Sequence, residues 1–177
     1  QKQCEVEGIR GSMDCKIDGI VTDVKSASSF GFKKFKEGKI LRDDPFGYVD
    51  QIKAYAYSEG ETQIGWLAID KTVGHLTYLK YDLADPEFKV DMEFNGTIAD
   101  RIKYLKEMVK KPEPEAVCHK PKPDGKSGNM QLAMGCSYCQ YKKHCYPKLR
   151  LFNYSYQPKY LCEVVKEPNV QELKLSD

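Results

Sequence analysis

The stretch that most constrains the fold of this chain is residues 11–26, GSMDCKIDGIVTDVKS. Its second half alternates in charge with a period of two, which is typical of a β-strand and places Asp23 and Lys25 on one face. The Asp18–Gly19 pair just before it is a strong signal for a hairpin turn. A strand entering that turn would bring Asp14 alongside Asp23. The stretch therefore predicts a hairpin in which two carboxylates and a lysine converge.

A convergence of this kind suits a hard divalent cation. Carboxylate oxygens are ligands that Mg²⁺ and Mn²⁺ accept, and a nearby ammonium can hold a metal-bound water or a phosphate oxygen. The alternative is an ordinary hairpin whose acidic and basic side chains are solvated. The residues of the hairpin leave both interpretations open.

Residues 48–58 predict a helix that ends before Gly60, because Ile52 and Tyr55 have the spacing of one buried helix face. Gln51 and Tyr55 are four residues apart and therefore share a side of this helix. A tyrosine packed on a sheet with a glutamine at its rim is the alternative to a functional role.

Three motifs in this order resemble the active site of the PD-(D/E)xK nuclease superfamily, in its RecB-like branch. Gly11–Asp14 matches the motif G-x-x-D, Asp23–Lys25 matches (D/E)-x-K, and Gln51–Tyr55 matches Q-x-x-x-Y. A single D-x-K triplet is common in charged proteins, so the resemblance depends on the three motifs together. It implies a restriction-endonuclease-like α/β fold, with a central mixed sheet flanked by helices. It also implies that Gln51 and Tyr55 face the metal and help to hold a DNA strand.

The resemblance further implies the roles of the hairpin residues. Asp14, Asp23 and the backbone carbonyl of Val24 would ligate one or two Mg²⁺ or Mn²⁺ ions. Lys25 would orient the attacking water or help to deprotonate it.

The implied activity is a metal-dependent DNA exonuclease acting on strand ends, in phage DNA replication, recombination or host-DNA breakdown. The segments around the cysteines and the C-terminal tyrosines are similar to phage-encoded exonucleases of the superfamily. The alternatives are a non-catalytic DNA-binding module and a zinc-stapled interaction module. Family members usually place helices before the first strand, so we expect these N-terminal helices to be missing from a chain that starts at Gln1. The sequence leaves the oligomeric state open.

Residues 27–47 predict a loop with a short helical piece. Lysines and phenylalanines alternate along it, which fits a surface for phosphates and bases. A charged loop pinned to the core by its aromatic rings is the alternative. The residues concerned are Lys33, Lys34, Lys36 and Lys39 with Phe30, Phe32 and Phe35.

Two more strands are predicted at residues 64–70 and 74–81, joined by a turn at 71–73. With the hairpin they would build a mixed sheet of four or five strands. His75, on the second of these strands, is expected to be structural. A helix is expected within residues 91–111, with lysines on its solvated face. Its apolar stripe comprises Ile98, Ile102, Leu105, Met108 and Val109.

From Pro112 the composition changes to proline, lysine, glycine and cysteine, which predicts an irregular lobe at 112–177 beside a nuclease core at 1–111. Such a segment buries little apolar surface, so a metal staple would help to order it. Cys136, Cys139 and Cys145 crowd together, and a C-x2-C pair is used by both zinc and iron–sulfur sites. This clustering favours a reducing compartment, and we expect the cytoplasm.

The spacing C-x2-C-x5-C also resembles the three C-terminal ligands of the iron–sulfur cluster in AddB-type nucleases and CRISPR-adaptation exonucleases. That resemblance implies a [4Fe–4S] cluster, for which Cys118 is our choice of fourth ligand and Cys4 the second choice. Zinc, with His119 or His144 as a substitute ligand, stays open, as do reduced cysteines without a metal. The remaining two, Cys15 and Cys162, are expected to be packing residues.

Composition excludes some classes of protein. The formal net charge of +2 means that the chain is no polycation, so any DNA contact must come from local basic patches. The mean hydropathy is −0.61, and no apolar run approaches the roughly 20 residues of a membrane span. No signal peptide is visible in the sequence.

Overall fold

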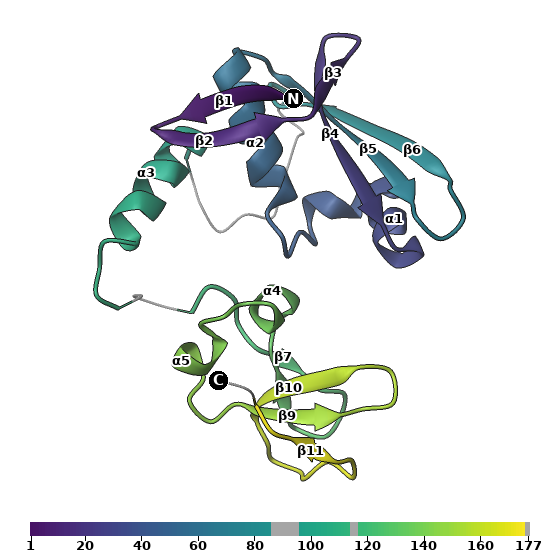
Figure 1. The fold of residues 1–177 in the computed structure, drawn as a ribbon, viewed down its shortest axis with the longest axis vertical. Helices are drawn as coiled ribbons and strands as arrows, with labels where there is room; N and C mark the ends of the chain where they lie inside the picture. The colour runs from purple at the N-terminus through teal and green to yellow at the C-terminus, as the bar shows by residue number, and fades with distance from the viewer. Residues whose placement is uncertain (86–95, 114–116, 176–177) are drawn as a thin grey trace. The chain divides into compact units, whose positions relative to one another are not determined.

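The computed structural model describes residues 1–85, 96–113 and 117–175, and divides the chain into two units (Figure 1). The units are Gln1–Pro112 and Glu113–Asp177. Their boundary falls one residue after the one that the change of composition predicts. Within the described ranges, no helix combines the length and apolar character needed to cross a membrane.

The first unit is built on a mixed sheet in the order β3-β4-β5-β6. Its strands are β3 (Cys15–Ile17), β4 (Ile20–Ala27), β5 (Gln63–Asp70) and β6 (Leu76–Asp82). The pairs β3–β4 and β5–β6 are antiparallel, whereas β4 and β5 run parallel. The expectation of an α/β unit with a four-stranded mixed sheet is therefore confirmed.

The predicted hairpin turn at Asp18 and Gly19 is also present, with φ of 50° and 82° at the two residues. Positive φ at both central positions is the geometry of a two-residue hairpin turn, which aspartate and glycine favour. The expected place of His75 is wrong by one position, because it lies in the turn before β6. There its carbonyl accepts the backbone N–H of Asp70 at 2.8 Å.

A second hairpin, which the sequence analysis did not anticipate, precedes the sheet. It consists of β1 (Lys2–Val6) and β2 (Ile9–Met13), and β1 lies against α2 (Tyr48–Glu59). Its turn again has positive φ at two residues, Glu7 and Gly8. Figure 1 shows this hairpin as a separate ribbon beside the helices of the first unit.

Three helical segments connect β4 to β5: α1 (Ser29–Lys36), η1 (Lys39–Leu41) and α2. Parallel strands require such a crossover, and both helices contact β4 and β5. Helix α2 ends at Gly60, with φ of 68°, as predicted. The core lies between these helices and the sheet. Its fully buried side chains include Val21, Val49, Ile52, Ile64 and Trp66.

The segment at 27–47 is more helical than expected, and its rings have two different roles. Phe32 and Phe35 are buried in the core, while Phe30 is 75% exposed. Several of the lysines are paired with acids, including Lys34 with Asp43 at 2.6 Å. Phe32 and Phe35 therefore pin this charged segment to the core, as the alternative interpretation predicted, whereas Phe30 does not.

Helix α3 (Ile98–Met108) is shorter than expected, and residues 91–95 of the expected range lie outside the described residues. It begins with a capping box between Thr97 and Asp100. The expected apolar stripe is wrong at Leu105 and Val109, which are 44% and 81% exposed. Ile98, near the start of α3, is buried, so the core-facing surface is confined to its first turns.

The lysines of α3 also do more than face solvent. Lys106 donates to the carbonyl of Glu7 at 2.8 Å, and Lys103 lies 3.5 Å from the carboxylate of the same residue. The helix is thereby attached to the turn of the β1–β2 hairpin.

The second unit contains a small antiparallel sheet in the order β11-β9-β10-β8-β7. Its elements are β7 (Lys122–Pro123), β8 (Met130–Gln131), α4 (Met134–Ser137), α5 (Lys142–Cys145), β9 (Arg150–Asn153), β10 (Pro158–Glu163) and β11 (Glu172–Leu173). The expectation of an irregular lobe is therefore corrected. Very short strands carry too few residues for their alternation to be recognised in the sequence.

The side chain of a buried asparagine binds the backbone of the segment that follows β10. Asn129 is 2% exposed and accepts the N–H groups of Val165 and Lys166 at 2.8 Å. Its amide also donates to the carbonyl of Lys166 at 2.8 Å. Phe152 and Leu161 form the apolar centre of the sheet, at 2% and 0% exposure.

We predict that Ile52→Ala lowers the free energy of unfolding of the first unit by about 2–5 kcal/mol, because Ile52 is fully buried between α2 and the sheet. The measurement is urea unfolding followed by tryptophan fluorescence, which reports on this unit because Trp66 is the chain's single tryptophan. Leu76→Ala, at an edge position 65% exposed, should change the value by less than about 0.5 kcal/mol. Equal losses in both variants would contradict the assignment of the core.

Candidate functional site

The β3–β4 hairpin holds Asp14 beside β4. Asp14 lies between β2 and β3, and its Oδ2 accepts the backbone N–H of Val24 at 2.9 Å. Its Oδ1 accepts the side-chain amide of Gln1 at 3.1 Å. The first carboxylate of the predicted set is therefore fixed to the strand that carries the second.

Asp23 is a buried carboxylate in the middle of β4, with only 3% of its surface exposed. Its Oδ1 accepts a hydrogen bond from Lys25 Nζ at 3.1 Å. Oδ2 lies 2.9 Å from the same ammonium, but among the described residues no donor approaches it with hydrogen-bond geometry. One oxygen of a buried carboxylate is thus left without a hydrogen bond, which is unusual for a buried polar atom.

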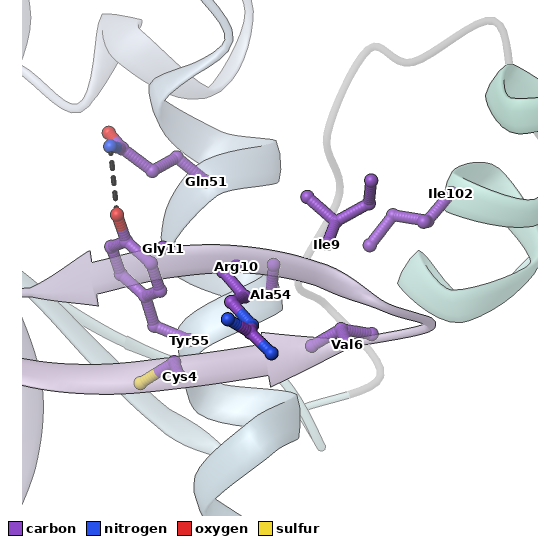
Figure 2. Close-up of a pocket in the computed structure, with 9 residues that line it drawn as sticks. All are labelled: Cys4, Val6, Ile9, Arg10, Gly11, Gln51, Ala54, Tyr55 and Ile102. Carbon is purple, nitrogen blue, oxygen red and sulfur yellow. Dashed lines mark hydrogen bonds between the residues drawn. The ribbon is translucent and has the colours of Figure 1, made fainter.

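Lys25 connects the sheet to helix α2. Its Nζ donates to Gln51 Oε1 at 3.1 Å and lies 4.5 Å from the centre of the Tyr48 ring. Because an ammonium has only donors, the amide oxygen of Gln51 faces the lysine and its nitrogen faces away. That nitrogen donates to the hydroxyl of Tyr55 at 3.1 Å, the bond drawn in Figure 2. A continuous chain of contacts therefore runs from Asp23 through Lys25 and Gln51 to Tyr55.

The close packing of β2 on Tyr55 explains why residue 11 is a glycine. A Cβ built at Gly11 would lie 2.9 Å from Cε1 of Tyr55, closer than real Cβ atoms approach a ring. Strand β2 can therefore pass directly over the tyrosine only because residue 11 has no side chain.

The electrostatics of the site are dominated by burial. Desolvation raises the pKa of Asp23 above the usual aspartate value of 3.8, and the charge of Asp14 raises it further. The ammonium of Lys25 opposes this rise. Two neighbouring carboxylates, of which Asp23 is paired with Lys25, leave an excess of negative charge when both are ionised. A site of this kind gains from an additional cation.

The structure thus brings five of the predicted side chains into one set: Asp14, Asp23, Lys25, Gln51 and Tyr55. Val24 contributes its N–H to Asp14, and the metal-ligand role of its carbonyl stays a prediction. Sequence reasoning missed Tyr48, whose ring lies under the lysine. The available signal was its spacing, because Tyr48 lies three residues before Gln51 and so on the same side of the helix.

The predicted cysteines are found in the second unit as free thiols. Cys136 and Cys139 lie on one tight turn, in which the N–H of Cys139 donates to the carbonyl of Cys136 at 3.1 Å. Burial raises the pKa of Cys136, and the charges of Cys118, Cys139 and Cys145 raise it further. Cys118, Cys139 and Cys145 are therefore within electrostatic range of Cys136.

Electrostatic interaction has a longer range than coordination. In the described parts of the chain, no three cysteine, histidine, aspartate or glutamate side chains form a group that could hold a metal ion. The four thiols would have to move closer to one another to ligate a metal ion. Cys4, the second choice as a fourth ligand, lies on β1 in the first unit. Cys162, which was expected to be a packing residue, donates a hydrogen bond to the carbonyl of Met130.

No protein-family model, curated protein or solved structure matches this chain.

We predict a pH-dependent difference in stability between the parent and the Asp23→Asn variant when divalent cations are absent. Because the pKa of Asp23 is raised by folding, its favourable contribution is complete below the unfolded value of 3.8 and is lost as the pH rises through the folded value. The parent should therefore lose stability relative to Asp23→Asn as the pH rises from about 4. Urea unfolding of both proteins across this range measures the difference.

The control is Asp18→Asn, which removes an exposed carboxylate from the turn of the same hairpin. This control shows how much the loss of one negative charge at the surface changes the pH dependence of stability. A parallel pH dependence in all three proteins would contradict the raised pKa of Asp23.

Proposed function

We propose that this chain is a metal-dependent deoxyribonuclease of the PD-(D/E)xK type, which hydrolyses phosphodiester bonds of DNA. The observation that carries the proposal is the convergence of Asp14, Asp23 and Lys25 at β4, with one oxygen of the buried Asp23 lacking a hydrogen bond. The mixed sheet with its helical crossover is compatible with a restriction-endonuclease-like core. DNA ends are the proposed substrate, in a phage-related process within the cytoplasm.

The residues present fit a hard cation. Asp23 would offer Oδ2, which lies 2.9 Å from the Lys25 ammonium but accepts no hydrogen bond, and Asp14 would offer the remaining lone pairs of a carboxylate that is already held by Val24. When bound, Mg²⁺ or Mn²⁺ supplies Lewis-acid stabilisation of the phosphate and lowers the pKa of a coordinated water.

Lys25 would then orient the attacking water and place its positive charge where negative charge develops on the phosphate. Its hydrogen bonds to Asp23 and Gln51 fix the ammonium in position before the substrate arrives. Gln51 and Tyr55 would hold the strand from the side of α2. Preorganised groups of this kind lose little energy to rearrangement during the reaction.

We predict that the parent cleaves end-labelled linear DNA with Mg²⁺ or Mn²⁺ and not with EDTA. Asp23→Asn and Lys25→Ala should each lower the cleavage rate by about 10²-fold or more, because each removes a charged group from the reacting centre. Single- and double-stranded substrates are compared, and the ladder of products gives the direction of cleavage. Asp18→Asn and Lys80→Ala, which change exposed residues on the same sheet, are the matched controls.

A thermal-shift measurement separates loss of metal from loss of fold. Mg²⁺ should raise the melting temperature of the parent and not that of Asp23→Asn, because only a protein that binds the ion is stabilised by it. DNA binding without cleavage by the parent would overturn the nuclease and favour a non-catalytic DNA-binding module. Zinc in the protein without DNA binding would favour an interaction module.

The second unit is proposed to hold a [4Fe–4S] cluster, or zinc, through Cys118, Cys136, Cys139 and Cys145. Two observations support this proposal: the tight turn shared by Cys136 and Cys139, and the rise in the pKa of Cys136 that burial causes and that Cys118, Cys139 and Cys145 increase. Thiolates are the ligands that both zinc and iron–sulfur clusters use.

We predict that protein purified without oxygen contains iron with the visible absorption of a cluster, or zinc in its place. Cys136→Ser should lose most of the bound metal, whereas Cys162→Ser should retain it, because Cys162 is outside the proposed set. Elemental analysis and absorption spectra make the comparison. A parent protein without iron or zinc would show that the cysteines are unliganded.

A further inference from the structure

A cavity of about 200 Å³ lies within the first unit, beside the candidate site (Figure 2). It is formed by the β1–β2 hairpin on one side and by helices α2 and α3 on the other. The side chains of Cys4, Val6, Ile9, Ala54 and Ile102 make its wall mainly apolar.

The volume indicates the size of an occupant. A cavity of about 150 Å³ lined by apolar residues accepts a benzene ring, and pockets for drug-sized molecules are about 300–1,000 Å³. The cavity here lies between these sizes. It suits a single flat ring system with an apolar face rather than an extended molecule.

Two residues belong both to the wall of the cavity and to the candidate site. Gln51 and Tyr55 line it, and Gln51 also accepts the hydrogen bond of Lys25. Tyr55 is held against the backbone of Gly11, which is itself part of the wall. A group bound in the cavity would therefore be a close neighbour of a group bound at Asp23 and Lys25.

A cation lies on the hairpin that forms one wall of the cavity. Arg10 belongs to the lining, but its side chain pairs with Glu5 on the face of the hairpin opposite Cys4 and Val6, and it is 82% exposed. Its partner Glu5, at 3.0 Å, is 55% exposed, so this surface ion pair is weak and exchanges readily with other anions. A guanidinium is well suited to bind a phosphate. An apolar ring-sized cavity behind a hairpin that carries a guanidinium on its outer face suits a nucleotide strand, in which flat bases are joined to anionic phosphates.

We propose that this cavity binds one base of the DNA strand whose phosphate lies at Asp14, Asp23 and Lys25, while Arg10 contacts a phosphate of the same strand. The proposal rests on the proposed function and adds to it a base-binding subsite. It explains why a ring-sized apolar cavity adjoins a charged site. A strand held by one base and by its phosphates would be fixed in register before cleavage.

The test compares two proteins and two kinds of strand. Fluorescently labelled single-stranded oligonucleotides carry an abasic site at one position at a time, counted from the end, and are titrated in EDTA so that no cleavage occurs. At one position the parent should bind the intact strand at least about fivefold more tightly than the abasic strand, because an enclosed base contributes favourable contacts. Ala54→Leu fills the cavity, so the ratio of the two affinities should fall to about one.

Two further variants make the result specific. Ala84→Leu adds the same bulk at an exposed position outside the cavity and should keep the parent's ratio. Arg10→Gln should weaken binding to intact and abasic strands alike, and lower the slope of log affinity against log salt by about 0.7. If Ala54→Leu does not fold, as judged by Trp66 fluorescence, Ile102→Trp fills the cavity from α3 instead.

The outcomes separate this inference from the proposed function. DNA binding with the same affinity at every abasic position overturns the base subsite and leaves the nuclease intact. A preference for the base that persists in the filled-cavity variants places the base elsewhere and also overturns the inference. If no strand binds the parent, the proposed function fails and the subsite fails with it.

Discussion

The parallel pairing of β4 with β5 is the constraint on which the first unit depends. Parallel neighbours cannot be joined by a tight turn, so the chain between them must cross over one face of the sheet. Here that crossover consists of α1, η1 and α2, and it encloses Val21, Ile64 and Trp66. The same crossover brings Gln51 and Tyr48 into contact with Lys25. Burial of the core and assembly of the candidate site are consequences of one connection.

Burial of Asp23 is the main energetic cost of this arrangement. An ionised carboxylate is stable inside a protein only when charges and donors compensate for the lost water. Lys25 compensates for part of that loss, while Asp14 adds a second negative charge nearby. Sites where burial and neighbouring charges shift a pKa are often functional, and Asp23 combines such a shift with one oxygen that accepts no hydrogen bond.

The β1–β2 hairpin extends the site beyond its charged centre. It passes over Tyr55 at Gly11, where any side chain would collide with the ring, and it reaches α3 through the contacts of Lys103 and Lys106 with Glu7. The cavity beside the site exists because these elements meet around small or short side chains such as Ala54 and Cys4. In the second unit, by contrast, short strands and the amide of Asn129 provide the order, and the thiols of the C-x2-C turn lie among them.

The sequence by itself determined the features that depend on neighbours along the chain. The Asp18–Gly19 turn, the alternation of β4, and the end of α2 at Gly60 follow from local backbone preferences and periodicity. The place of Gln51 and Tyr55 on one helix face follows in the same way. The order of the three motifs also placed the candidate residues, although only through their resemblance to a family.

Tertiary structure alone decided which of these features meet and what each one buries. Periodicity predicted an apolar stripe along α3, but the exposure of Leu105 and Val109 depends on how much of α2 lies opposite them. The bond from Lys25 to Gln51, the bond from Val24 to Asp14, and the cavity behind Tyr55 all join residues from different elements. Such contacts depend on the packing of distant segments, for which a local pattern of residues carries no information.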